Sequence, residues 1–280
     1  MSKIICITGA SSGIGLATAL KFAREGWTVY AGTRNLARDH ELYREETNLH
    51  FVHLEVTDPD SIQLVIDEIE REHGSLDVLF ANAGFGYLRA LGQAPVEDIQ
   101  RVFDTNVYGV MHTIRAALPL LRKSGYAHIV ATSSVGGLVG QPMNEIYCAS
   151  KFAVEGLLES LATYYKPQFN IDVTLLEAGA IATEFNKTVL GHVAGTGGIL
   201  DDEYKPVIDA YTATFLQRNV EPQTAESVAD VMWELVHMET KPVRIRTSER
   251  AEAFVSRKVS NDPTGLEGVL STRKIQLNMQ

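Results

Sequence analysis

The sequence predicts an α/β fold, a doubly wound parallel sheet of about seven strands with helices on both faces. Short β-branched runs alternate with segments of helical periodicity along the chain. The first run, residues 3–7, is apolar throughout, which is typical of a parallel strand buried on both faces. Alternation of this kind builds a parallel sheet with right-handed crossovers. Ligands bind to such sheets beyond the carboxyl ends of the strands.

Composition limits the possible partners. The 280 residues suffice for one large domain, and the formal net charge of −10 argues against nucleic acid and anionic membrane as general partners. The two cysteines, Cys6 and Cys148, do not suggest a disulfide framework. No secretory signal and no apolar run of membrane length is visible. We therefore expect a cytoplasmic protein that acts on a small molecule, without contact to a membrane.

A glycine-rich turn follows the first predicted strand and precedes a segment of helical spacing from Leu16 to Ala23. Glycines permit a tight turn and close approach of the backbone to a ligand, and a helix N-terminus attracts phosphate. Strand, turn and helix together predict a Rossmann-like dinucleotide site, although a glycine turn alone would also fit an ordinary tight turn. The expected ligand contacts are Gly9, Ser11, Ser12, Gly13, Ile14 and Gly15.

The second predicted strand, residues 27–31, ends without an acidic residue. An acid at this place commonly binds the ribose 2′-hydroxyl of NAD. Here the strand runs into Gly32-Thr33-Arg34-Asn35. A guanidinium suits the geometry of a phosphate, so Arg34 favours NADP(H) over NAD(H). The alternative interpretation of Arg34 is a solvated surface side chain.

The remaining elements continue the alternation. The pattern predicts strands over residues 49–54, 76–80, 127–132 and 171–176, and an edge strand over 243–246. It predicts helices over residues 36–46, 58–73, 96–102, 106–118, 147–161 and 227–238. Asn82-Ala83-Gly84 and Ser133-Ser134 each follow a strand, so they are expected at the same edge as the glycine turn.

The stretch Tyr147-Cys148-Ala149-Ser150-Lys151 opens one of these helices. Residues four apart lie on one helix face, so Lys151 is expected beside Tyr147. A nearby ammonium favours the phenolate and lowers the pKa of a tyrosine from its usual value of about 10. Such a tyrosine can pass a proton to or from an alcohol or carbonyl oxygen. The same spacing occurs on ordinary helices, so this prediction depends on the neighbouring strand ends.

We expect one catalytic domain over residues 1–250 and a C-terminal extension over residues 251–280. From residue 185 to 218 the pattern weakens and glycines interrupt it. A long segment beside the ligand edge predicts a substrate lid, and the alternative is a mobile loop without a role. The histidines and cysteines show no ligand spacing, so we expect no catalytic metal.

Taken together, these residues resemble the short-chain dehydrogenase/reductase family. The resemblance is carried, in order, by Thr8-Gly9-x-x-x-Gly13-x-Gly15, Asn82-Ala83-Gly84, Asn106, Ser134 and Tyr147-x-x-x-Lys151. It covers residues 3–185 well and the C-terminal third loosely. The stretches 135–137 and 147–153 are similar to the branch of estradiol-type hydroxysteroid and retinol dehydrogenases.

The resemblance implies a role for each matching residue. Tyr147 would be the acid/base, and Lys151 would lower its pKa and bind the nicotinamide ribose. Ser134 would orient the substrate oxygen, and Asn106 would hold a water in a proton relay. Further cofactor contacts would come from the strand ends, at Val56, Asn82, Ala83, Gly84, Gly179, Ile181 and Thr183. In two places the chain departs from the family pattern: Glu55 stands where Asp is usual, and Ala178 where Pro is frequent.

The implied function is an NADP(H)-dependent oxidoreductase that moves a hydride between nicotinamide and a carbonyl or alcohol carbon, with a steroid- or retinoid-like substrate as the finer expectation. Two alternatives stay open, namely a reductase of small ketones, aldehydes or ketoacyl groups and a non-catalytic NADP-sensing binding protein. A homodimer or homotetramer is expected by the same resemblance. Candidate substrate contacts are Gln141, Met143, Asn144 and Phe185.

Overall fold

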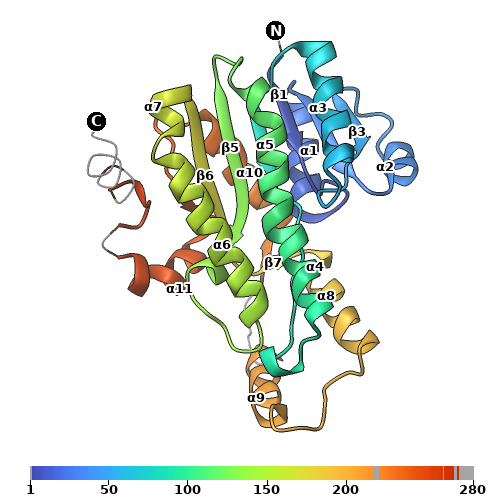
Figure 1. Ribbon diagram of the computed structural model, residues 1–280, viewed down its shortest axis with the longest axis vertical. Helices are drawn as coiled ribbons and strands as arrows, with labels where there is room; N and C mark the ends of the chain where they lie inside the picture. Colours follow the sequence, from blue (N-terminus) through green and yellow to red (C-terminus); the bar gives the residue numbers. More distant parts are fainter. Residues whose placement is uncertain (1, 217–220, 261, 268–269, 271–280) are drawn as a thin grey trace.

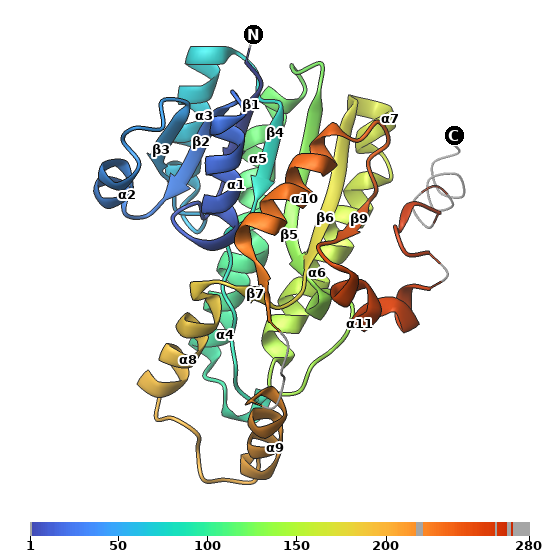
Figure 2. The same ribbon diagram turned by 180° about the vertical axis from the view of Figure 1, so that it is seen from behind.

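The computed structural model describes residues 2–216, 221–260, 262–267 and 270. Its main sheet has seven strands in the order β3-β2-β1-β4-β5-β6-β9. Every neighbouring pair is parallel. The predicted doubly wound parallel sheet is confirmed, and the strand order reverses between β1 and β4, which is where such sheets bind nucleotides (Figures 1 and 2).

The strands agree closely with the predicted ones. They are β1 (Ile4–Ile7), β2 (Thr28–Thr33), β3 (Leu49–His53), β4 (Val78–Ala81), β5 (Ala127–Ser134), β6 (Ile171–Ala178) and β9 (Arg244–Arg246). The register between β5 and β6 runs from Ala127 opposite Ile171 to Ser134 opposite Ala178, so these two strands end together at the ligand edge. Two further short strands, β7 (Ile181–Ala182) and β8 (Gln223–Thr224), pair with each other beyond that edge.

Helices cover both faces of the main sheet. One face carries α3 (Pro59–His73), α5 (Gly109–Leu121) and α6 (Glu145–Ala162), which lie in front of the strands in Figure 1. The other carries α1 (Gly13–Arg24) and α10 (Ala225–His237), which lie in front in Figure 2. The remaining helices are α2 (Leu36–Leu42), α4 (Val96–Phe103), α7 (Tyr165–Phe169), α8 (Glu184–Gly195), α9 (Lys205–Leu216) and α11 (Glu249–Val259).

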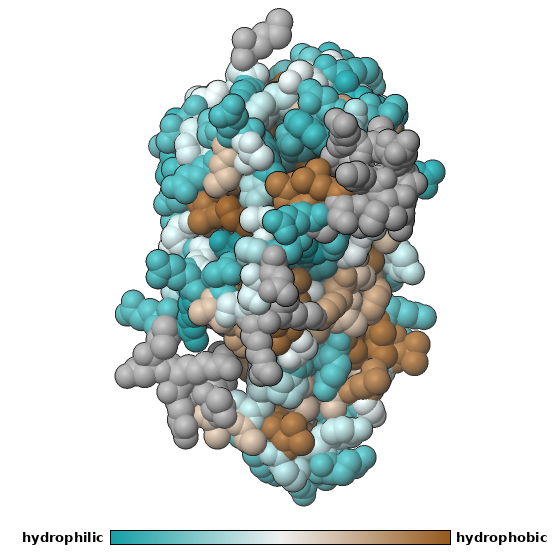
Figure 3. All heavy atoms as spheres, turned by 90° about the vertical axis from the view of Figure 1, so that its left-hand side faces the viewer, coloured by the Kyte–Doolittle hydropathy of each residue, from teal (hydrophilic) through white to brown (hydrophobic). Residues whose placement is uncertain are grey.

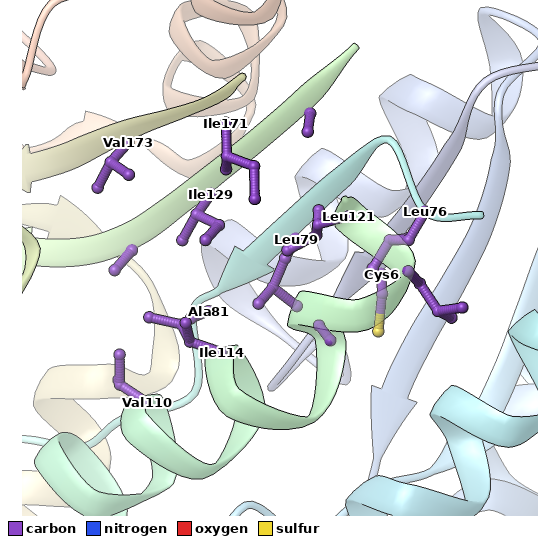
Figure 4. Close-up of a cluster of buried hydrophobic side chains, with 14 of the residues drawn as sticks. Cys6, Leu76, Leu79, Ala81, Val110, Ile114, Leu121, Ile129, Ile171 and Val173 are labelled. Atoms are coloured by element: carbon purple, nitrogen blue, oxygen red, sulfur yellow. The ribbon is translucent and has the colours of Figure 1, made fainter. Parts of the chain in front are cut away.

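An apolar cluster lies on each face of the sheet and packs its strands against the covering helices. Figure 4 shows Leu79 and Ile129 of the sheet among Ile114 and Leu121 of α5. On the other face, Phe22 of α1 belongs to a second cluster that includes the sheet and α10. Burying a side chain of this size contributes about 1.5–3 kcal/mol. The two clusters therefore hold the strand ends, and the side chains on them, in place.

Local signals set the ends of α3. The Asp58 carboxylate accepts a hydrogen bond from the Asp60 amide at 3.0 Å, and Pro59 occupies the first helical position. At the other end, Gly74 has a φ of 75°, which a residue with a side chain rarely adopts. The predicted start and stop of this helix are confirmed.

The stretch with the interrupted pattern forms two helices, α8 and α9, joined by a turn in which Gly197 and Gly198 have positive φ. Figures 1 and 2 show both helices beyond the carboxyl ends of the strands, away from the body of the sheet. Residues 217 and 218 of the predicted lid lie outside the described residues.

The predicted domain boundary at residue 250 falls inside α11, which buries Ala251 and Val255. Within the predicted extension, residues 261, 268–269 and 271–280 lie outside the described part of the chain. Among the described residues, no helix is both long and apolar enough to cross a membrane. Figure 3 shows the surface on the side of the C-terminal residues, where apolar patches are separated by hydrophilic surface.

Candidate active site

A cavity of about 1450 Å³ lies along the carboxyl ends of the strands. Pockets for one small ligand usually measure about 300–1000 Å³, so this cavity has room for a dinucleotide and a second molecule. Most of the predicted site residues line it: Gly9, Ser11, Ser12, Gly13, Ile14, Arg34, Val56, Asn82, Ala83, Gly84, Ser134, Gln141, Asn144, Tyr147, Lys151, Gly179, Ile181, Thr183 and Phe185.

Three predicted residues do not line this cavity. Gly15 packs against the carbonyl of Gly9, where a Cβ would collide, so it serves the contact of helix with turn. Asn106 is fully buried. Met143 is 1% exposed and packs with Ala90 and Ile208 in a small apolar cluster under the lid. The expected contact of Met143 with substrate is therefore wrong for this structure.

The glycine turn has the shape that a pyrophosphate requires. Gly9 has a φ of 65°, and a Cβ there would lie 2.8 Å from the Cα of Ala83. The Ser12 side chain does not cap α1, and the first turn of α1 carries no acidic residue. The N–H groups and positive dipole end of α1 are thus open to an anion. These features fit the phosphates of a dinucleotide.

Hydrogen bonds hold the end of β4 against the glycine turn. The hydroxyl of Thr8 accepts hydrogen bonds from the amides of Asn82 at 3.0 Å and Ala83 at 2.9 Å. The Asn82 amide group donates to the carbonyls of Thr8 and Gly9 and accepts from Thr132. Thr8 was part of the motif, but its contribution to the site becomes visible only here.

At the end of β2, Arg34 lines the cavity and its side chain is 80% exposed. Its only ion pair within the described residues is to Glu55 at 3.7 Å. The nearest acid that follows β2 in the chain, Asp39, is buried and bound by Thr33 and Arg38. Asp39 is therefore occupied, and Arg34 is the side chain at this end that can reach a ligand.

Tyr147 lines the cavity and is half-buried. Burial raises the pKa of Tyr147 to about 12, and a hydrogen bond from the Ser134 side chain opposes this shift. The Lys151 Nζ atom lies 5.9 Å from the centre of the Tyr147 ring. The pKa of Tyr147 is therefore raised and not lowered as expected, because desolvation of the phenolate is the largest influence on it. Tyr147 is a protonated phenol at neutral pH.

Lys151 is 4% exposed and donates a hydrogen bond to the carbonyl of Thr132 at 2.8 Å. Burial lowers the pKa of Lys151 to about 8, and the carboxylate of Glu155, one turn further along α6, counteracts this shift. Glu155 in turn accepts hydrogen bonds from Ser133 and from Arg244. The Lys151 ammonium, which stands on α6, is thus held against the end of β5.

Asn106 lies in a π-helical turn, η2 (Asp104–Tyr108), between α4 and α5. Its amide donates to the Phe85 carbonyl at 2.9 Å and to the Ser150 hydroxyl at 3.1 Å, and its oxygen accepts from the Phe85 amide at 3.0 Å. A Cβ on Gly84 would lie 3.1 Å from that oxygen and 3.5 Å from the Lys151 Nζ atom. Asn106 therefore joins the chain after β4 to α6.

The lid is held by side chains that sequence reasoning missed. Arg89 is 3% exposed and donates to the carbonyl of Gly198 at 2.6 Å and to the carbonyl and hydroxyl of Thr196 at 2.9 and 2.7 Å. His192 of α8 contacts Asp98 at 3.1 Å. These partners are about a hundred residues apart in the chain, so no local pattern announces them.

On the cavity side of the lid, the ring of Phe185 meets the ring of Tyr147 edge to face, with 5.8 Å between their centres. Tyr211 of α9 also lines the cavity and is bound by Asn144. The lid thus reaches the predicted acid/base directly. Within the described residues, no group of three His, Cys, Asp or Glu side chains is arranged to hold a metal ion.

A glycine turn at the start of a parallel sheet, followed by a Ser, Tyr and Lys at the same edge, defines a dinucleotide-binding oxidoreductase. Residues 3–193 match the family model described as short chain dehydrogenase, and the chain belongs to that family. It is an enzyme of the class that acts on CH–OH donors.

Curated relatives lie in the branch expected from the sequence. Retinol dehydrogenase 8 of Bos taurus is 35% identical over 275 residues, covering 94% of this chain and 86% of its own. The 17-beta-hydroxysteroid dehydrogenase type 1 of Homo sapiens is 37% identical over 198 residues, covering 67% of this chain and 60% of its own. A solved short-chain dehydrogenase from Burkholderia phymatum in complex with NAD is 27% identical, with a TM-score of 0.77 and coverage of 94% and 96%.

Proposed function

We propose that this protein is an NADP(H)-dependent oxidoreductase that interconverts a ketone or aldehyde with its alcohol, with Tyr147 as the acid/base. The observation that carries the proposal is that Ser134, Tyr147 and Lys151 share one cavity with the glycine turn. A protein that only senses the nucleotide has no need of these three side chains together. This favours an enzyme over the binding-protein alternative.

The nicotinamide ring, when bound, supplies or accepts the hydride. The side chains of this chain handle the proton and the substrate oxygen. The Tyr147 phenol, protonated at neutral pH, donates its proton to the alkoxide that forms during reduction, a much stronger base than a phenolate. The Ser134 hydroxyl orients the same oxygen, and the Lys151 ammonium stabilises the phenolate left behind.

The preference for NADP(H) is supported by the end of β2. Arg34 is exposed there, and Asp39 is occupied by Thr33 and Arg38. The contact of Arg34 with Glu55 is solvent-exposed, so it is worth at most about 1 kcal/mol and a 2′-phosphate can replace it. A charge-assisted bond to that phosphate is worth about 1.5–3 kcal/mol.

A hydrophobic substrate of steroid or retinoid size is supported by the walls of the cavity beyond Tyr147. Phe185, Val207 and Phe254 line it and are 37%, 47% and 48% exposed. Apolar side chains that open into a cavity of this volume gain by burial against an apolar ligand. The two curated relatives are named for retinol and a hydroxysteroid, which agrees with this substrate class. Small carbonyl compounds are the second candidate substrates, because a cavity that admits a large ligand also admits a small one.

The test is optical measurement of NADPH oxidation against steroid ketones, retinal, small aldehydes and ketones, and a ketoacyl thioester. We expect turnover on the hydrophobic compounds, slower turnover with NADH, and a loss of about 10²–10⁴-fold in the Tyr147→Phe variant with NADPH binding retained. Turnover in Tyr147→Phe at the wild-type rate would refute the acid/base assignment. Turnover only on small carbonyls would move the substrate to the second candidate, and NADPH binding without any turnover would favour the sensor.

Self-association is also part of the proposal. Tyr108, Met111 and Phe152 place large apolar side chains at the surface of η2, α5 and α6, and they are 50%, 37% and 39% exposed. Neighbouring exposed apolar groups on two helices favour a contact between two copies. Sedimentation equilibrium distinguishes a dimer or tetramer from a monomer.

A further inference from the structure

A polar pair stands on the wall of the cavity close to Tyr147. Asn144 immediately precedes α6, and Tyr147 follows it by about one helical turn, a rise of about 4.5 Å. Tyr211 comes from α9 of the lid, and both Asn144 and Tyr211 line the cavity. The Nδ2 atom of Asn144 donates a hydrogen bond to the Tyr211 hydroxyl at 3.2 Å.

The hydrogen-bonding capacity of this pair is only partly used. The Asn144 amide group donates to the carbonyl of Pro142 at 2.9 Å as well as to Tyr211, which employs both of its hydrogens. Within the residues that the structure describes, the Oδ1 atom of Asn144 and the hydroxyl hydrogen of Tyr211 have no protein partner. One acceptor and one donor therefore remain side by side, the combination that a ligand hydroxyl satisfies completely.

The apolar surroundings of the pair make its unused acceptor and donor matter for the affinity of a ligand. Phe185 and Val207 line the same cavity as the pair. Met143, the residue before Asn144, and Ile208 of α9 pack together with Ala90 in a small apolar cluster. An apolar ligand that fills the cavity removes water from the pair without replacing its hydrogen bonds, which is unfavourable. A ligand with an oxygen at this place avoids that cost, so the pair discriminates between the two.

We propose that Asn144 and Tyr211 form a second polar subsite, which binds a hydroxyl or carbonyl oxygen of the substrate other than the one that reacts at Tyr147. The substrate class is then an apolar body with two oxygen functions, one reduced or oxidised at Tyr147 and one bound at the subsite. This inference rests on the proposed function, since it takes Tyr147 as the reacting end.

The same hydrogen bond also has a purely mechanical consequence, because it ties α9 of the lid to the start of α6. A latch of this kind would help every substrate equally. A subsite would help only ligands that carry the second oxygen. The two roles are therefore distinguished by the ratio of the affinities for ligands with and without the second oxygen, and not by the affinity for one ligand.

The experiment uses ketones of two sizes, trans-2-decalone and 5α-androstan-17-one, each with and without a hydroxyl on the ring farthest from the ketone. Their dissociation constants are measured by calorimetry on protein saturated with NADP⁺, which cannot reduce the ketone. The NADPH absorbance is read after each titration to verify that the added hydroxyl has not been oxidised. We expect the hydroxylated member of at least one frame to bind about tenfold more tightly to the wild type, the usual worth of a neutral hydrogen bond. In Tyr211→Phe we expect this ratio to fall to about threefold or less.

Tyr204→Phe is the matched control. Tyr204 precedes α9 on the same lid, packs with the cluster of Ala90, Met143 and Ile208 and does not line the cavity. We expect Tyr204→Phe to keep the wild-type ratio. A preference that survives in Tyr211→Phe, equal weakening of both members of a pair, or no preference in the wild type would each overturn the subsite. NADPH oxidation is measured separately, so a retained ratio without turnover would leave the subsite standing and remove the proposed reaction.

Discussion

The catalytic edge and the lid differ in how their side chains are held. At the catalytic edge, functional groups are fixed by backbone groups of a strand or of the loop that follows one: Lys151 by the Thr132 carbonyl of β5, and Asn106 by both backbone groups of Phe85 after β4. The lid is fixed by side chains of a distant segment, chiefly Arg89 and Asp98. Strand ends cannot move without breaking the sheet, whereas a lid held by a few side chains can.

This difference separates chemistry from choice of substrate. The groups that carry the proton and the cofactor depend on a sheet whose core is continuous with them. The groups that meet the rest of the substrate, such as Phe185 and Tyr211, stand on helices outside that core. Substitutions at the edge should therefore change the rate for all substrates, and substitutions in the lid should change affinity and selectivity.

The largest effect is expected from Lys151→Met at the catalytic edge. Loss of the ammonium that stabilises the Tyr147 phenolate should reduce turnover by about 10²-fold or more on every substrate. The control Lys123→Met should keep wild-type turnover, since Lys123 is half-exposed and pairs with Glu70 at the surface. Steady-state kinetics on two unrelated ketones checks both points, and a loss confined to one substrate would contradict the assignment.

The same variant has a signature in stability. The pKa of Lys151 in the fold is about 8, below the 10.5 of a free lysine, so the unfolded chain binds more protons between these values. The free energy of unfolding of the wild type should therefore rise with pH across this window, by an amount on the order of 3 kcal/mol. In Lys151→Met this rise should be missing. Parallel thermal denaturation curves of the two proteins at pH 8 and pH 10 would speak against a buried ammonium.

A smaller effect is expected at the cofactor end of the edge, from Arg34→Asp. The change removes a partner for the 2′-phosphate and adds a like charge, so the ratio of kcat/KM with NADPH to that with NADH should fall about 10- to 100-fold. The factor should be the same for every substrate, because Arg34 follows β2 at the cofactor end of the site and is proposed to contact only the cofactor. An unchanged ratio would remove Arg34 from the account of cofactor choice.

The smallest effect on turnover is expected from Arg89→Met in the lid. The carbonyls of Thr196 and Gly198 lose their buried donor, which weakens the attachment of the predicted lid to the rest of the domain. We expect KM for ketones to rise about tenfold while NADPH binding changes little, with the exposed Arg71→Met as control. Equal losses in substrate and NADPH binding would contradict the view that the lid affects substrate affinity without affecting cofactor binding.

Much of the catalytic edge was predictable from the sequence because its signals are local. Apolar runs and helical periodicity located the strands and helices, and residues directly after strands were expected at one edge. The glycine turn and Ser134 were found in this way, whereas Tyr147 and Lys151 were found from their spacing on a helix and from the family resemblance. The structure brings all of them to one cavity. The carboxyl ends of all strands in a parallel sheet lie at one edge, so a position directly after a strand was enough to place a residue at that edge.

The tertiary structure alone decided what depends on surroundings. Burial is the largest influence on the pKa of Tyr147, and the spacing of Tyr147 and Lys151 in the sequence could not predict it. The packing of the lid moves Met143 into a small core while its neighbour Asn144 faces the cavity. The partners of Arg89 lie more than a hundred residues away. Periodicity records which face of an element is apolar, but it carries no information on which distant element will cover that face or remove water from it.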